Sequence, residues 1–129
     1  MGGVAVTAVG SNDIRKAMAF YDELLAVIGL GTAMEHPSGG RMYGSGFGST
    51  MFCVLPPFDG QPATIGNGSM VSFACDSPGQ ATAMHAKALS LGGKDEGAPG
   101  QRGGEDSPIF AAYFRDLDGN KICAFHYAQ

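Results

Sequence analysis

The fold is decided by the stretch Arg115-Asp116-Leu117-Asp118-Gly119-Asn120-Lys121-Ile122-Cys123-Ala124-Phe125. Two runs of β-type residues, 109–115 and 120–126, flank a turn made of Asp, Gly and Asn. Asp and Asn side chains bond their own backbone in turns, and Gly readily adopts a positive φ. This composition predicts that the chain ends in a β-hairpin.

Upstream of the hairpin, the sequence predicts a strand at 70–75 and then a helix. Ser77 is suited to cap that helix, Pro78 to occupy its first position, and Gln80 to be the reciprocal capping partner. A stripe of Ala, Met and Leu follows at helical spacing and ends at two glycines. The segment 94–106 is rich in Gly and charge, which predicts a loop with one short strand.

The first half of the chain has the same order of elements. A strand is predicted at 4–9, and a helix capped by Ser11 or Asn12 and ended by Gly29 follows it. Three short strands are predicted next, at 32–36, 41–44 and 50–55. The sequence therefore predicts one α+β domain, 1–129, of two βαβββ modules: module 1 at about 1–56, a linker at 57–65 and module 2 at about 66–129.

Two motifs resemble a known family. The Asp-x-Asp-Gly-Asn turn at 116–120 and the helical run Ala19-Phe20-Tyr21-Asp22 are similar to motifs of the vicinal-oxygen-chelate superfamily, which includes glyoxalases, bleomycin-resistance proteins and extradiol dioxygenases. The resemblance spans nearly the whole chain. It implies that each module curls into a half-barrel, that the two half-barrels enclose a cavity, and that the protein is a homodimer.

The resemblance also implies a divalent metal held by His and carboxylate ligands. The matching positions hold Val6, Met70 and Cys123, and module symmetry places the fourth near Cys53. Val has no donor atom, while Met and Cys are soft donors unsuited to Mg, Mn, Fe or Ni. A soft-metal site is an alternative, but Cys and Met more often simply fill a core. We therefore expect neither a metal nor another cofactor.

The cavity is expected to be mostly apolar. Alternation places Ile109, Ala111 and Tyr113 on one strand face, and the hairpin sets Tyr113 opposite Cys123. Arg102 is a candidate anchor for an anionic ligand at the mouth of the cavity. The alternative is that Arg102 is an ordinary solvated arginine on the surface. No catalytic residue is assigned, and the predicted ligand-binding cavity comprises Val6, Met51, Cys53, Met70, Arg102, Tyr113, Cys123 and Phe125.

The three histidines are expected to be structural. His126 is out of phase with Cys123 along its strand, His85 lies beside the helix stripe, and His36 falls in a loop. None is paired at a spacing typical of catalysis.

Composition narrows the classes of partner. The 129 residues are 44% hydrophobic and 16% charged, with a net charge of −4 and a pI of about 5.1. This acidity and the scattered Lys and Arg disfavour nucleic acid and anionic membranes as partners. The opening residues lack a secretory pattern, and an odd number of cysteines, three, suggests free thiols in a reducing compartment. We therefore expect the protein to be located in the cytoplasm.

Three functions remain open at this stage. The first is a metal-free protein that binds an apolar or aromatic small molecule in the cavity. The second is a glyoxalase-like lyase or extradiol-type dioxygenase that uses displaced ligands or thiol chemistry. The third is an enzymatically silent structural module whose cavity is filled by its own side chains.

Overall fold

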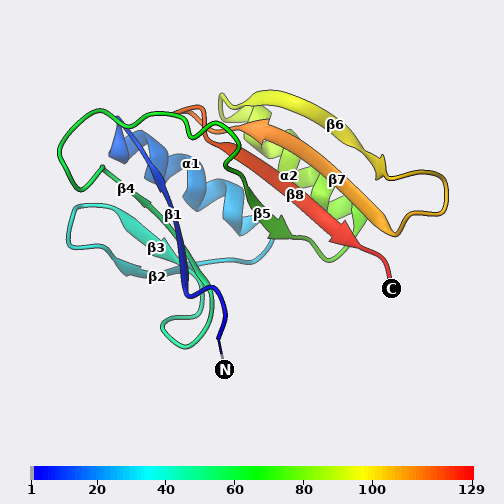
Figure 1. Ribbon diagram of the computed structural model, residues 1–129, viewed down its shortest axis with the longest axis horizontal. Helices are drawn as coiled ribbons and strands as arrows, with labels where there is room; N and C mark the ends of the chain where they lie inside the picture. Colours follow the sequence, from blue (N-terminus) through cyan, green and yellow to red (C-terminus); the bar gives the residue numbers. More distant parts are fainter. Residues whose placement is uncertain (1) are drawn as a thin grey trace.

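The computed structural model describes residues 2–129, so Met1, the first residue of predicted module 1, lies outside the described residues. Two βαβββ modules follow one another along the chain, which confirms the predicted α+β fold (Figure 1). The first has β1 Val6–Gly10, α1 Ile14–Ala26, β2 Thr32–Glu35, β3 Arg41–Tyr43 and β4 Met51–Leu55. The second has β5 Val71–Ala74, α2 Pro78–Ser90, β6 Lys94–Arg102, β7 Ile109–Arg115 and β8 Lys121–Tyr127. The predicted module boundaries remain predictions.

The two modules have the same sheet topology. The strand orders are β1-β4-β3-β2 and β5-β8-β7-β6. In each sheet the first strand pairs in parallel with the last strand of its module, and the other pairings are antiparallel. Each module is therefore the same small sheet crossed by one helix.

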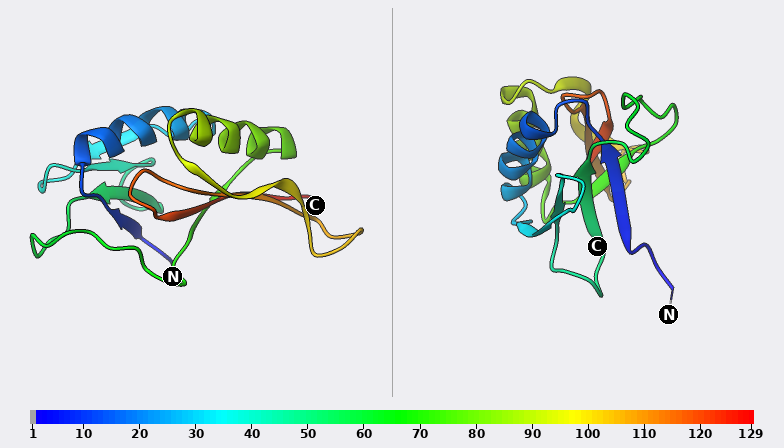
Figure 2. Two further views of the ribbon diagram at one scale, coloured as in Figure 1. Left: turned by 90° about the horizontal axis from the view of Figure 1, so that it is seen from above. Right: turned by 90° about the vertical axis from the view of Figure 1, so that its left-hand side faces the viewer.

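Both helices lie on the same side of the two sheets (Figure 2). Beneath them runs a core that continues from one module into the other. The Tyr21 and Phe52 ring centroids are 4.9 Å apart, and those of Phe52 and Phe73 are 5.0 Å apart. The first pair is tilted and the second is edge-on, and aromatic pairs in such geometries attract each other beyond their burial alone. The shared core thus joins sheet to sheet as well as helix to sheet.

The predicted hairpin is confirmed. Strands β7 and β8 pair from Ile109 with Tyr127 to Arg115 with Lys121, and Gly119 in the turn has a φ of 89°. The positive φ explains the glycine, because a Cβ is strained in that region. The register also sets Tyr113 opposite Cys123, as predicted.

Asp116 in this turn ties the two modules together. Its buried carboxylate accepts hydrogen bonds from the Tyr21 hydroxyl, from the backbone of Asp118 and Asn120, and from the Asn120 side chain. The Asn120 amide in turn donates to the Gly10 carbonyl oxygen, 3.0 Å away. Burial and the adjacent Asp116 carboxylate raise the pKa of Tyr21 well above its ordinary value, so Tyr21 is a permanent donor.

The helix starts were predicted in part. Helix α1 is capped by Asp13, whose carboxylate accepts from the Lys16 backbone, and not by Ser11 or Asn12. The Ser11 hydroxyl oxygen instead accepts a hydrogen bond from the Asp13 backbone N–H, just before the helix begins. Helix α2 is capped by Ser77 as predicted, while the Gln80 side chain accepts from the Asp76 backbone. Ser11, Asn12 and Asp13 are consecutive, and all three residue types cap helices well, so the sequence alone does not identify which of them caps α1.

The prediction of a loop at 94–106 was wrong for most of its length. Strand β6 occupies nine of these residues, Lys94–Arg102, and pairs with β7. The register shifts between Asp95 and Gly97 and again between Gly97 and Gly100. Glycines that weaken a regular strand are accommodated by such irregularities, and the long partner strand β7 supplies the pairing.

Candidate functional site

Each sheet has one face toward the helices and one face away from them, here called the inner face. On β4, Phe52 and Val54 belong to the helix-side core, so alternation puts Met51 and Cys53 on the first inner face. These two residues form a separate buried cluster with Met42, against which Ala33, Met34 and Leu55 pack. The first inner face is therefore filled by its own apolar side chains.

The second inner face carries a polar row. Ser72 on β5, Cys123 on β8 and Tyr113 on β7 lie side by side in register across the sheet. Cys123 is 1% exposed, and burial raises the pKa of its thiol. The hydroxyls of Ser72 and Tyr113 act in the opposite direction on that pKa without cancelling the rise. Cys123 is thus a neutral thiol at neutral pH and a poor nucleophile.

Two cations border this row. The Arg102 guanidinium carbon lies 5.5 Å from the Tyr113 ring centroid, and the Lys121 ammonium nitrogen lies 5.3 Å from it. Both distances are within the range of cation–π attraction. The second inner face therefore combines an aromatic ring, a buried thiol and two positive charges.

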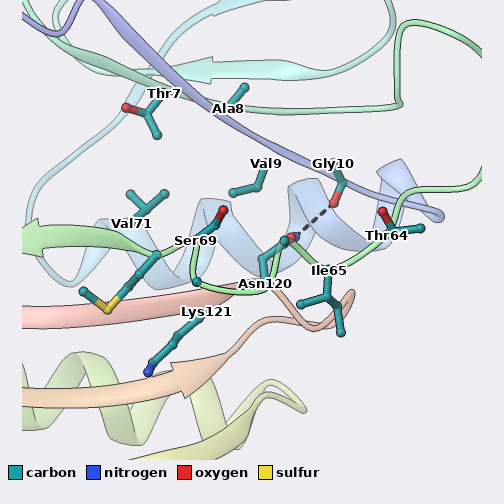
Figure 3. A pocket seen from close by; sticks show the side chains of 13 residues that line it. Thr7, Ala8, Val9, Gly10, Thr64, Ile65, Ser69, Val71, Asn120 and Lys121 are labelled. Carbon is teal, nitrogen blue, oxygen red and sulfur yellow. Dashed lines mark hydrogen bonds between the residues drawn. The ribbon is translucent and has the colours of Figure 1, made fainter.

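A hollow of about 520 Å³ lies next to this face, between β1 and the start of β8. Figure 3 shows Thr7, Ala8 and Val9 on one side of it and Lys121 on the other, with the Asn120–Gly10 hydrogen bond across one end. The segment from Thr64 to Val71 completes the lining and includes Met70. Volumes of this size accommodate small organic ligands.

The structure divides the predicted cavity residues between the two sheets. Tyr113 and Cys123 are neighbours, with Arg102 beside the Tyr113 ring. Phe125 follows Cys123 by two residues on β8, opposite Ala111. The remaining predicted residues lie elsewhere: Met51 and Cys53 on the first inner face, Val6 exposed at the start of β1, and Met70 exposed in the hollow. Their joint role in one cavity stays a prediction.

Sequence reasoning missed Ser72, Lys121 and the part of the hollow formed by residues 64–69. Alternation along β8 was a usable signal for Lys121, because it shares a face with Cys123 and Phe125. Ser72 lies two residues after Met70, so the same rule applied to it. No sequence pattern predicted that residues 64–69 lie next to β1 and the start of β8.

The residues at the four implied metal positions do not fit a divalent metal of the family's kind. Val6 offers no donor, and burial raises the pKa of both thiols, Cys53 and Cys123, which lie in different sheets. A bound metal requires deprotonated thiolates converging on one point. Within residues 2–129, no group of three or more His, Cys, Asp or Glu side chains is placed to hold a metal ion.

The histidines make structural contacts, as expected. His85 is buried, its Nε2 lies 2.9 Å from an Asp95 carboxylate oxygen, and its ring packs edge-on against Phe114. The hydrogen bond with His85 lowers the pKa of the Asp95 carboxyl. His126 contacts the Cys75 carbonyl oxygen from the helix side of β8, and His36 contacts Ser38.

Comparison with known proteins decides the family. The model of the Glyoxalase/Bleomycin resistance protein/Dioxygenase superfamily matches residues 3–124. The chain belongs to this superfamily. Among solved structures, a glyoxalase/bleomycin resistance protein from Albidiferax ferrireducens is 41% identical, with a TM-score of 0.83 over 95% of this chain and 96% of that one.

More distant members share the fold alone. A putative glyoxalase from Bacillus halodurans is 16% identical, with a TM-score of 0.73 over 97% of this chain and 96% of that one. A lactoylglutathione lyase from Agrobacterium tumefaciens is 19% identical, with a TM-score of 0.63 over 98% and 94%. No curated protein matches the chain. Among the helices of the described part of the chain, none has the length and apolar character required to cross a membrane.

Proposed function

We propose that this superfamily member binds an apolar or aromatic small molecule on its second inner face without a metal. The observation that carries the proposal is the buried Cys123 thiol, at the position that the resemblance matches to the family's terminal carboxylate. A buried thiol with a raised pKa is neutral and is no ligand for a hard cation, while the half-buried Tyr113 beside it offers an aromatic ring to a small molecule.

The neighbouring residues support this choice. Phe125 and Ala111 extend the second inner face along the strands, and Tyr113 offers both an aromatic face and a hydroxyl. The adjacent hollow is large enough for part of a small ligand. Binding sites of this kind are mainly apolar, with a few polar groups that fix orientation.

We further propose a homodimer in a reducing compartment, the cytoplasm. Both helices lie on one side of the sheets, which leaves the opposite side free of helices and open to a second copy of the chain (Figure 2). Val6 and Met70 are 42% and 46% exposed, and apolar groups of this size are favourably buried in an interface. The three free cysteines, Cys53, Cys75 and Cys123, fit a compartment that keeps thiols reduced.

The test is ligand binding by purified protein after treatment with a chelator. A panel of small aromatic compounds is screened for a rise in melting temperature, since a ligand at 100 times its Kd stabilises by about 2.7 kcal/mol. We expect stabilisation to survive the chelator and to be lost in Tyr113→Ala. The matched control, Met51→Leu on the first inner face, should keep it.

Two results contradict the proposal. If activity or binding disappears on chelation and returns with Ni, Fe, Mn or Zn, the protein is a metal-dependent lyase or dioxygenase. If no compound in a broad panel stabilises the protein, it is a silent structural module.

A further inference from the structure

Arg102 and Lys121 are cations without an acidic partner among residues 2–129. Two arginines of the same sheets, by contrast, are paired with carboxylates. Arg115, paired in register with Lys121, lies 2.8 Å from a Glu96 carboxylate oxygen, and Arg41 contacts both Asp22 and Glu35. The Arg102 guanidinium carbon and the Lys121 ammonium nitrogen lie 5.5 and 5.3 Å from the same ring centroid, so an anion at the edge of the Tyr113 ring would be attracted by both charges.

The strand beneath these groups is shaped to hold them. A methyl group added at Gly97 would lie 2.8 Å from Tyr113 Cδ2, and one added at Gly100 would lie 3.0 Å from Arg102 Nη1. The missing side chains thus leave room for the ring and for the guanidinium. Arg102 Nη2 also donates to the Ala98 carbonyl oxygen at 2.6 Å, which fixes its position.

This arrangement leaves donors free for a ligand. A guanidinium has five N–H groups, of which the Ala98 carbonyl takes one, and an ammonium has three. Arginine binds carboxylate and phosphate in a planar, two-pronged manner, and lysine adds a point charge. Both cations also lower the pKa of Cys123, which places their charges toward the row of Ser72, Cys123 and Tyr113.

We propose that Arg102 and Lys121 form an anion subsite beside Tyr113, so that the ligand is an aromatic or apolar molecule bearing a carboxylate or a phosphate. This inference rests on the proposed function, because the subsite orients a ligand whose body lies on the second inner face. Nothing in it requires a metal or a chemical step.

The experiment compares three probes of similar size: benzoate, phenyl phosphate and the neutral benzamide. Each is titrated into the ¹⁵N-labelled protein, and backbone amide shifts are followed by NMR. We expect one or both anions to bind at least about 10-fold more tightly than benzamide, since a charge-assisted hydrogen bond typically contributes that much. The anion that binds more tightly identifies the ligand as carboxylate or phosphate.

Three test variants and two control variants locate the effect. Arg102→Gln and Lys121→Gln should each remove most of the preference for the anion, whereas Arg15→Gln, on the exposed surface of α1, should not change it. Gly97→Ala keeps both charges but displaces the Tyr113 ring, so it should also weaken anion binding. Its control is Gly31→Ala, where an added methyl meets nothing within 4 Å.

The outcomes separate this inference from the proposed function. If benzamide binds as well as the anions, the subsite is wrong while the proposed function stands. If no probe binds, the subsite is wrong, and the broad thermal-shift panel alone decides the proposed function. If Arg102→Gln dissociates a dimer and leaves benzoate binding unchanged, the cations serve a second copy of the chain and the subsite is wrong.

Discussion

The two inner faces of the molecule differ although their sheets have the same topology. On the first, Met42, Met51 and Cys53 are buried against one another, with exposures of 6%, 1% and 1%. On the second, Ser72 and Tyr113 flank a single buried thiol, Cys123. The first face is closed by thioethers, and the second is edged by two cations.

This difference shows how a duplicated scaffold can specialise. Methionine is flexible and fills irregular spaces, so a methionine cluster gives a sheet a second small core. A face that carries hydroxyls and unpaired cations gains little stability from them and is better suited to recognition. We therefore expect substitutions on the first face to affect mainly stability and those on the second to affect mainly binding.

The largest effect should come from Asp116, which fixes the two faces relative to each other. Asp116→Ala removes the acceptor of the buried Tyr21 hydroxyl and of the Asn120 amide. Leaving the buried Tyr21 hydroxyl and several part-buried donors unpaired costs about 3–5 kcal/mol in the free energy of unfolding. Urea unfolding measures this cost, and Asp106→Ala in the β6–β7 loop is the control. A loss below 1 kcal/mol would contradict the role given to Asp116.

The next largest effect contrasts the faces directly. Met51→Ala on the first face should destabilise the protein by about 2–4 kcal/mol, because truncating a buried methionine leaves a cavity. Tyr113→Ala on the second face should cost less, since its ring is half-buried, yet it should abolish ligand binding. Equal losses of stability in the two variants would show that both faces are simply core.

Thiol chemistry tests whether the second face is reactive. Burial raises the pKa of Cys53, Cys75 and Cys123, that of Cys75 to about 11, so all three should be mostly protonated at pH 7.5. We expect native protein to react with iodoacetamide much more slowly than the urea-unfolded chain, with mass spectrometry locating the label. Selective fast labelling of Cys123 would favour thiol chemistry instead.

The smallest effect is a pH dependence on the helix side of the second module. The hydrogen bond with His85 lowers the pKa of Asp95 in the folded state. A carboxyl of this kind stabilises the fold above its unfolded pKa of about 3.9, and the contribution is lost as pH falls through the folded value. Below about pH 4, the stability of Asp95→Asn should therefore fall less steeply than that of the native protein. Asp106→Asn should behave like the native protein.

Much of the fold could be predicted from local sequence. The Asp and Gly residues of the 116–120 turn define a hairpin by their own backbone chemistry, and Ser77-Pro78 define a helix start. The sequence predicted one short strand within 94–106 but not the full length of β6, because Gly97 and Gly100 are typical of a loop and only pairing with β7 makes them part of a strand. Local composition does not contain such partner-dependent structure.

The site was harder to predict than the fold. Tyr113 and Cys123 could be paired from the hairpin alone, and the structure places them together. Met51 and Cys53 lie on a different inner face from Cys123 because the two sheets are arranged side by side. Alternation within one strand does not reveal how sheets are arranged. The approach of Lys121 and Arg102 to one ring depends on the same long-range packing.

One measurement tests the central claim most directly: the map of ligand-induced amide shifts in chelator-treated protein. With an aromatic ligand in excess, the largest shifts should fall around Ser72, Tyr113 and Cys123, while Met42 and Met51 on the first inner face stay unchanged. Shifts centred on the first inner face, or shifts that appear only after a divalent metal is added, would contradict the claim.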